Sequence, residues 1–286
     1  MGGVYVKLLG RAGPVDVLKG VRRIKSIKAD LPREYKGIEL HAFADWHIGD
    51  PLCDMKLIKE RIEYVRTTPN AYCVLNGDIC NWASKMSVSD VYAEQLTPMQ
   101  QIEEFVNLIR PIKDKVLAIT PGNHEFRSYK TEGIDITEIA ARELGLYDKY
   151  SKTSALLFIR FGEGNKKESN NSGEYRKLCY TVYLIHGSGG GRKEGAKINK
   201  LAELASIVDA DIYIHSHTHL GAILKQSFHR VDIQNSNAMI VDKLFVNTAA
   251  NLNYGGYAEI AEYKPASKAN PVIYLSGRKK EFTARL

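Results

Sequence analysis

Short apolar runs alternate with helical patterns along most of the chain. Short runs of apolar and β-branched residues predict strands, and apolar residues spaced three and four apart predict helices. Strands are expected at residues 38–44, 71–75, 115–119, 155–161, 178–185 and 211–215, and mostly strand follows from residue 222. Helices are expected at residues 55–66, 98–109, 136–144 and 197–208, with Pro98 suited to a helix start and Gly145 to a C-cap. This alternation predicts an α/β protein.

The pattern divides the chain into two parts. Residues 1–37 show no clear period, and we interpret them as a basic N-terminal extension of uncertain structure. Residues 38–286 are expected to form one domain. Within that domain, the polar stretch at residues 162–177 predicts an exposed hairpin loop between two strands.

The chain carries no signal for a membrane or for export. No apolar run approaches the ~18 residues of a membrane helix. The first apolar run is too short for a signal peptide, and Val6 breaks the myristoylation pattern. The four cysteines form no C-x-x-C pair and are expected to be reduced. We therefore expect a cytoplasmic protein without a membrane partner.

The formal net charge of +7 is concentrated at the two ends of the chain. Residues 1–40 hold nine Lys/Arg against four Asp/Glu, and residues 264–286 hold six against one, so each end carries +5. Such basic ends could attract a polyanion such as nucleic acid. A solvated basic surface is the more ordinary interpretation, and charge alone leaves both open.

Polar clusters built from metal-ligand residue types follow five of the expected strands. The clusters are Asp45-Trp46-His47, Asn76-Gly77-Asp78-Ile79-Cys80-Asn81, Pro121-Gly122-Asn123-His124-Glu125, His186-Gly187 and Ser216-His217-Thr218-His219. In open α/β sheets, ligands bind beyond the carboxyl ends of the strands, so the five clusters are expected to meet in one crevice.

The spacing inside the clusters indicates shared sites. Side chains two apart in an extended segment point the same way, so Asp45 and His47 can share one metal, and so can His217 and His219. Asp, Asn and His together offer oxygen and nitrogen ligands. Such a set suits Mn, Fe, Zn or similar divalent ions rather than a thiolate zinc site.

The motifs D-x-H, G-D-x-x-N, G-N-H-E, H-G and H-T-H, in this order over residues 38–220, resemble those of the calcineurin-like metallophosphoesterase superfamily. The resemblance implies the family's α/β fold, a two-sheet β-sandwich flanked by helices in four αββα layers. It also implies two divalent metal ions, with Mn preferred and Fe, Zn, Mg or Ni as alternatives. Phosphate esters would be hydrolysed by metal-activated hydroxide.

The same resemblance assigns the metal ligands and one catalytic residue. One metal would be held by Asp45, His47 and His219, and the other by Asn123, His186 and His217, with Asp78 bridging both. His124 would face the substrate phosphate, where it could donate a proton to the leaving oxygen or stabilise the phosphoryl charge.

The sequence departs from the serine/threonine phosphatase branch of that superfamily. That branch reads G-D-x-x-D-R-G and R-G-N-H-E, whereas this chain reads GDICNWA and PGNHE. Asn81 therefore stands where that branch has its second Asp, and both arginines are missing. The remaining pattern is more similar to the phosphodiesterase and nuclease branches.

Asn81 is expected to contact the substrate. Further substrate contacts are expected from two Gly-containing loops. Arg192 or Lys193, in the loop 187–195, could bind a phosphate, or the loop could be a plain linker. Tyr254 could stack on a base, or belong to an ordinary Gly-rich turn. Of the remaining histidines, His41 is expected in the core and His215 as a neighbour of the metal ligands.

Three functions remain open at this point. A metal-dependent phosphodiesterase is favoured, and a nuclease is one form of it. A phosphomonoesterase acting on a small molecule, a nucleotide or a phosphoprotein is the first alternative. The second is a non-catalytic scaffold with the same fold, as a retromer subunit of this superfamily looks to be.

Overall fold

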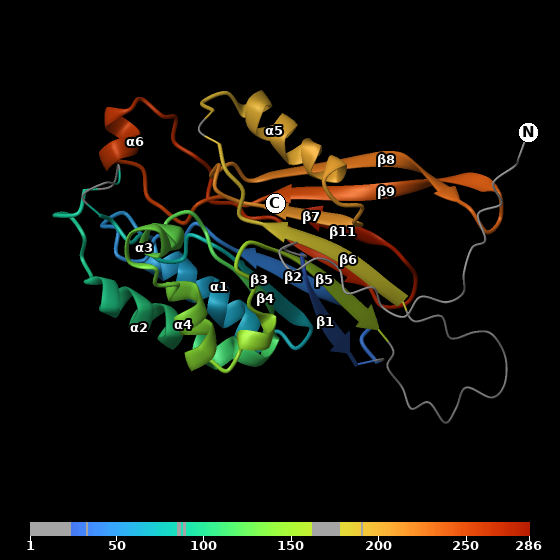
Figure 1. The fold of residues 1–286 in the computed structure, drawn as a ribbon, viewed down its shortest axis with the longest axis horizontal. Helices are drawn as coiled ribbons and strands as arrows, with labels where there is room; N and C mark the ends of the chain where they lie inside the picture. The colour runs from blue at the N-terminus through green and yellow to red at the C-terminus, as the bar shows by residue number, and fades with distance from the viewer. Residues whose placement is uncertain (1–23, 33, 85–86, 88–89, 162–177, 190) are drawn as a thin grey trace, which may run out of the picture.

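The computed structural model describes residues 24–32, 34–84, 87, 90–161, 178–189 and 191–286. Two mixed β-sheets pack face to face between layers of helices (Figure 1). The five-stranded sheet runs in the order β11 (Phe282–Arg285), β10 (Val272–Ser276), β2 (Gly37–Phe43), β3 (Ala71–Asn76) and β4 (Val116–Thr120). The six-stranded sheet runs β1 (Lys25–Leu31), β5 (Ser154–Phe161), β6 (Leu178–Ile185), β7 (Ile212–His215), β9 (Asn237–Asn247) and β8 (Ala222–Asp232).

Helices cover the outer faces of both sheets. Beside the five-stranded sheet lie α1 (Met55–Thr67), α2 (Pro98–Ile109), α3 (Glu125–Glu132) and α4 (Ile136–Glu143). The six-stranded sheet carries α5 (Glu194–Ala202), and the short helix α6 (Gly256–Ile260) lies near one end of the molecule (Figure 1). The α/β sandwich expected from the resemblance is therefore confirmed.

Three separate apolar cores hold the four layers together. One lies between α1, α2, α4 and the five-stranded sheet, a second fills the space between the sheets, and a third joins α5 to the six-stranded sheet. The inner strands contribute to two cores at once, and β4 is buried along its whole length. This explains why β4 reads as a continuous apolar run rather than an alternating one.

The helix ends follow from local sequence chemistry. Thr97 and Gln100 form a capping box at the start of α2, where Pro98 occupies the first helical position. Asp54 caps α1 by accepting a hydrogen bond from the backbone N–H of Leu57. Gly145 adopts a left-handed conformation, with φ of 73°, just after α4. These signals explain the close match between the predicted and observed ends of the three helices.

The structure adds a strand within the predicted N-terminal extension. β1 pairs in parallel with β5, from Lys25 opposite Ala155 to Leu31 opposite Phe161. Its buried side chains are Ile27 and Leu31, so the apolar signal in the sequence is short. Residues 1–23 and the predicted hairpin loop at residues 162–177 lie outside the described residues, although β5 and β6 on either side of that loop do pair antiparallel.

One helix differs from the prediction, and the state of the cysteines agrees with it. The helix expected at residues 197–208 begins earlier, as α5, and continues as the 3₁₀ turn η4 (Glu203–Ser206). The four cysteines are free thiols, as expected. Within the described part of the chain, no helix has both the length and the apolar character needed to cross a membrane.

The sheet topology sets the position of the polar clusters. β2, β3 and β4 are parallel to one another in one sheet, and β6, β7 and β9 are parallel in the other. Their carboxyl ends therefore gather at one end of each sheet, where the five clusters begin. The loops after β2, β3, β4, β6 and β7 all start at this end of the sandwich.

Candidate metal centre

The structure brings the seven predicted metal ligands into one cluster. Three groups have ligand atoms that all lie within 4.8 Å of one another, namely Asp45/His47/His219, His47/Asp78/His124 and Asp78/His186/His217. Asp78 and His47 each belong to two groups, so the groups form one continuous cluster. The seventh predicted ligand, Asn123, contacts two of its histidines.

The first half of the cluster joins the loop after β2 to the loop after β7. His47 Nε2 lies 3.3 Å from His219 Nε2, although the two residues are 172 positions apart in the chain. His219 Nε2 lies 3.4 Å from Asp45 Oδ1. The three side chains assigned to one metal thus present their ligand atoms to a common point.

The second half is centred on Asn123 and Asp78. Asn123 Oδ1 lies 2.6 Å from His217 Nδ1 and 3.2 Å from His186 Nε2. His186 Nε2 also lies 3.1 Å from Asp78 Oδ2. On its other side, Asp78 Oδ2 is 3.8 Å from Nε2 of His124. Asp78 therefore lies between the two halves.

The backbone of the cluster is unusual. Five of the seven predicted ligands have left-handed φ angles between 51° and 68°, namely Asp45, His47, Asp78, His217 and His219. Non-glycine residues rarely adopt this region, and such residues concentrate at functional sites. The paired residues Asp45 and His47 do meet, but the extended segment assumed from their spacing is wrong. Each of the two side chains instead reaches the cluster because its own backbone is in the left-handed conformation.

Burial makes the cluster electrostatically dependent on cations. The side chains of Asp45 and Asp78 are 0% and 1% exposed. Burial alone would raise the pKa of each carboxyl group, but hydrogen bonds and nearby imidazoles lower both pKa values. Among the described residues, the ion-pair partners of both carboxylates are histidines. Two buried carboxylates need such compensation, which a divalent ion would supply directly.

The histidines respond in opposite ways to this environment. Burial opposes the charged form of His186, yet the charge and hydrogen bond of Asp78 raise the pKa of His186 to about 10. Burial, followed by the charge of His124, holds the pKa of His47 well below its ordinary value. Neutral imidazoles and ionised carboxylates are the forms that bind metals. The types of donor fit divalent metal ions, and His186 would lose its proton when a metal binds.

Neighbouring polar groups hold the ligands in place. Nδ1 of His186 donates to the carbonyl oxygen of Asn76 over 2.7 Å, which directs Nε2 of His186 into the cluster. Asp45 Oδ2 accepts a hydrogen bond of 3.0 Å from Thr248 Oγ1. Nδ1 of His215 donates to Asn247 Oδ1, and the ring of His215 packs under Gly187. His215 thus supports the cluster without contributing a ligand atom to the three groups.

No protein-family profile matches this sequence, and no curated protein matches it. Several solved structures overlap with the chain, all at TM-scores below 0.5. Vacuolar protein sorting 29 from Cryptosporidium parvum is 16% identical, covers 87% of this chain and 97% of its own, and has a TM-score of 0.38. A Streptococcus pneumoniae protein described as a predicted phosphoesterase is 12% identical, with coverages of 87% and 98% and a TM-score of 0.32.

The third structure is a Saccharomyces cerevisiae serine/threonine phosphatase described as similar to human phosphatase PP5. It is 9% identical, covers 92% of this chain and 82% of its own, and has a TM-score of 0.35. The observed fold is the one that the resemblance drawn from the motifs implies. Because the overlaps are low, function has to be inferred from the chain's own side chains.

Unlike the predicted metal ligands, the predicted substrate-binding residues do not form one cluster. Asn81 is buried, and its side-chain amide donates a hydrogen bond to Glu94. Arg192 lies over the ring of Tyr263, 5.2 Å from its centroid, and Tyr254 Oη donates to the Tyr263 carbonyl oxygen. Lys193 is exposed at the start of α5. Arg192 and Tyr254 are therefore linked to each other through Tyr263.

Two residues that the sequence did not single out belong to the site. Glu125 is buried, and its carboxylate accepts hydrogen bonds from the backbone N–H groups of Asp78, Ile79, Cys80 and Gly122. Arg127 contacts His124. Glu125 is part of the G-N-H-E motif, so its type was visible. Its role depends on a loop 45 to 47 positions earlier, which spacing does not reveal.

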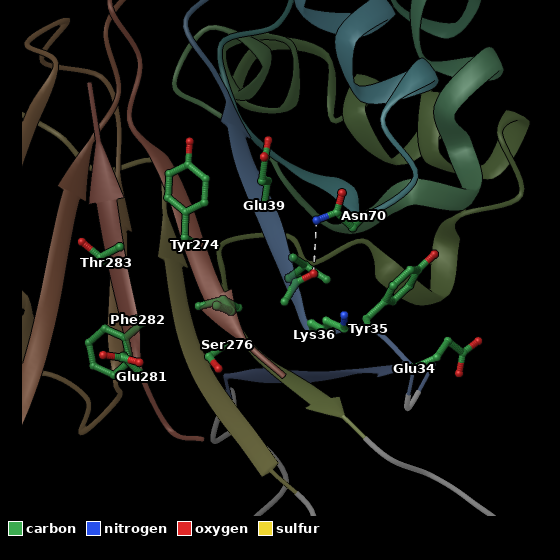
Figure 2. Close-up of a pocket in the computed structure, with 13 residues that line it drawn as sticks. Glu34, Tyr35, Lys36, Glu39, Asn70, Tyr274, Ser276, Glu281, Phe282 and Thr283 are labelled. Carbon is green, nitrogen blue, oxygen red and sulfur yellow. Dashed lines mark hydrogen bonds between the residues drawn. The ribbon is translucent and has the colours of Figure 1, made fainter. Parts of the chain in front are cut away.

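A groove of about 610 Å³ lies at the opposite end of β2 from the cluster (Figure 2). It is lined by Tyr35 from the loop before β2, by Asn70 from the loop before β3, and by Tyr274 and Phe282 from the β10–β11 hairpin. None of the seven predicted ligands lines it.

Proposed function

We propose that this chain is a metal-dependent phosphoesterase of the calcineurin-like kind, and that it prefers phosphodiesters, including nucleic acid. The central observation is the continuous cluster of three ligand groups that share His47 and Asp78. Its members come from five loops at the carboxyl ends of strands in two sheets. Clustered Asp, Asn and His side chains on left-handed backbone support a built metal site rather than a chance arrangement.

Each half of the cluster would hold one divalent ion. Asp45, His47 and His219 would bind the first, and Asn123, His186 and His217 the second, with Asp78 between them. When bound, such ions supply Lewis-acid activation of a phosphoryl group and lower the pKa of a coordinated water. The oxygen and nitrogen donors suit Mn, Fe, Zn, Mg or Ni, and among these Mn is proposed on the basis of the family resemblance.

His124 would act on the substrate rather than on the metals. Its Nδ1 donates to the carbonyl oxygen of Asn81 over 2.6 Å, which fixes the plane of the ring. Its Nε2 consequently faces the cluster, 3.8 Å from Asp78 Oδ2. From this position the protonated ring can donate a hydrogen bond from Nε2 to a phosphoryl or leaving-group oxygen.

Turnover of esters that differ in charge tests this function. We expect the Mn²⁺-loaded protein to hydrolyse bis-p-nitrophenyl phosphate faster than p-nitrophenyl phosphate. His124→Ala should lower kcat by about a hundredfold, the scale of a lost general acid–base group. His229→Ala, on the exposed part of β8, is the matched control. Single- and double-stranded nucleic acid are assayed alongside.

Each outcome of this assay is informative. A clear preference for the monoester would replace the phosphodiesterase assignment with a phosphomonoesterase. A protein that binds metal but turns over none of these esters or nucleic acids would contradict an enzymatic function and favour a non-catalytic scaffold.

A further inference from the structure

Arg127 lies beside His124 on the first turn of α3. Residues three apart on a helix share one face, which places the guanidinium next to the imidazole. Arg127 Nη2 is 3.0 Å from His124 Nε2. Arg127 Nη1 donates to the carbonyl oxygens of Asn81 and Trp82, each over 3.3 Å. The side chain is half-buried, and it is anchored to the loop that also carries Asp78.

The contact between Arg127 and His124 has only one chemical interpretation. A guanidinium group can donate hydrogen bonds but cannot accept them. His124 Nε2 must therefore be the acceptor, and the ring proton must sit on Nδ1. That agrees with the hydrogen bond from His124 Nδ1 to the carbonyl oxygen of Asn81. Arg127 consequently helps to fix both the tautomer and the orientation of His124.

The guanidinium group still has donors to offer. It has five N–H bonds, and among the described residues three hydrogen bonds to acceptors are formed. At least two donors remain for a ligand. They belong to a permanent positive charge that lies next to His124, whose Nε2 faces the cluster.

We propose that Arg127 binds the non-bridging oxygens of the substrate's phosphoryl group, an assignment that rests on the proposed function. The planar fork of an arginine matches two oxygens of a phosphate, and such charge-assisted hydrogen bonds are strong. Two carbonyl oxygens and one imidazole hold the fork before any ligand arrives. Arg127 is thus a substrate-binding residue that also positions His124.

Arg127→Gln and Arg127→Lys test this proposal against Lys130→Gln, an exposed residue on the same helix. Steady-state kinetics are measured on bis-p-nitrophenyl phosphate with Mn²⁺. Binding of inorganic phosphate to the Mn²⁺-loaded proteins is measured in parallel by calorimetry. Metal content and thermal unfolding are recorded for every variant, so that a loss of folding is recognised.

We expect Arg127→Gln to raise KM and the Kd for inorganic phosphate by about ten- to a hundredfold, the loss expected for hydrogen bonds to a charged group. Arg127→Lys, which keeps the charge without the fork, should fall between Arg127→Gln and the unaltered protein. Metal content should not change. Should Arg127→Gln fail to fold, the comparison of Arg127→Lys with Lys130→Gln carries the test.

Two results would overturn the proposal. One is phosphate affinity and KM that stay unchanged in both Arg127 variants. The other is a fall in kcat alone, with the affinity for phosphate retained. Failure of the proposed function itself looks different, because the unaltered protein would then turn over no ester at all. Phosphate binding would still show whether Arg127 holds the anion.

Discussion

Two buried carboxylates, Asp45 and Asp78, dominate the chemistry of the cluster at the scale of single residues. Imidazoles face both carboxylates: His186 is the main partner of Asp78, and His219 is the main partner of Asp45. A metal ion that binds there needs the unprotonated Nε2 of His186. Protons and metal ions therefore compete for the same nitrogen.

This competition predicts that metal binding releases a proton. The raised pKa of His186, about 10, keeps the imidazole protonated at neutral pH in the metal-free protein. The apparent affinity for Mn²⁺ should therefore rise with pH up to about 10, by roughly tenfold per pH unit for one displaced proton. Calorimetry in buffers of different ionisation enthalpy measures the released protons. An observed enthalpy that is the same in every buffer would contradict the prediction.

Glu125 supports the loops that carry the predicted metal ligands, without being a predicted ligand itself. Its Oε2 accepts from the backbone N–H groups of Asp78 and Gly122, and its Oε1 from those of Ile79 and Cys80. One carboxylate thus ties the loop after β3 to the loop after β4. Because both oxygens accept two hydrogen bonds, no neutral side chain of the same shape can replace it.

Glu125→Gln should therefore loosen the site. The amide NH₂ group would face two backbone N–H donors, which leaves buried polar groups unsatisfied and costs about 2 kcal/mol of unfolding free energy. We expect Mn²⁺ affinity to fall by about ten- to a hundredfold, as for other residues that support metal ligands. Denaturant unfolding and metal titration measure the two effects. Glu132→Gln, exposed on the same helix, is the control, and equal behaviour of both variants would refute the role of Glu125.

At the scale of elements, the turns after β3 and β4 pack directly on each other. A Cβ atom on Gly122 would lie 2.1 Å from Asp78 Oδ1 and 2.3 Å from the Asp78 backbone nitrogen. Gly77, with φ of 86°, would place a Cβ atom 2.4 Å from the Gly122 nitrogen. Neither turn leaves room for a side chain, so the two strands can bring Asp78 and Asn123 together only with glycine at these positions.

Gly122→Ala is expected to displace Asp78 and to lower the affinity for Mn²⁺ by at least about tenfold, since the new methyl group overlaps backbone as well as side chain. Gly195→Ala in α5 is the matched control, because a Cβ atom there has nothing within 4 Å. Isothermal titration with Mn²⁺ compares the two variants. Equal affinities would show that the close approach of the two turns does not determine the site.

The order of most helices and strands could be predicted from the sequence, because polar residues mark the end of each apolar strand. β6 and α2 begin and end where the apolar pattern predicts. The polar cluster after each strand indicated a shared site once parallel strands were expected. β1 could not be foreseen with the same ease, because its burial is confined to Ile27 and Leu31. α3 begins inside a metal-ligand motif, where ligand residues hide the helical period.

The details of the site needed the structure. Left-handed φ angles at Asp45 and His47 have only a weak signal in residue type, because Asp and His adopt them more often than most residues but far less often than glycine. The hydrogen bond from the buried Asn81 amide to Glu94 could not be predicted either. Arg127 does not belong to any of the sequence motifs. These features depend on contacts between residues far apart in the chain, which local patterns cannot report.

For the whole molecule, the cluster lies where the two sheets of the sandwich present their strand ends together. Asp45, Asp78 and Asn123 come from the five-stranded sheet, and His186, His217 and His219 come from the six-stranded sheet. Neither sheet alone carries a complete set for either metal. The packing of the sheets against each other therefore assembles the candidate site.

Anomalous X-ray scattering from a crystal of the full chain soaked in Mn²⁺ tests this arrangement most directly. Two peaks are predicted, one among Asp45, His47 and His219 and one among Asn123, His186 and His217, with Asp78 in contact with both. A crystal that binds Mn²⁺ elsewhere, or that shows no peak among these seven side chains, would contradict the metal centre and the function built on it.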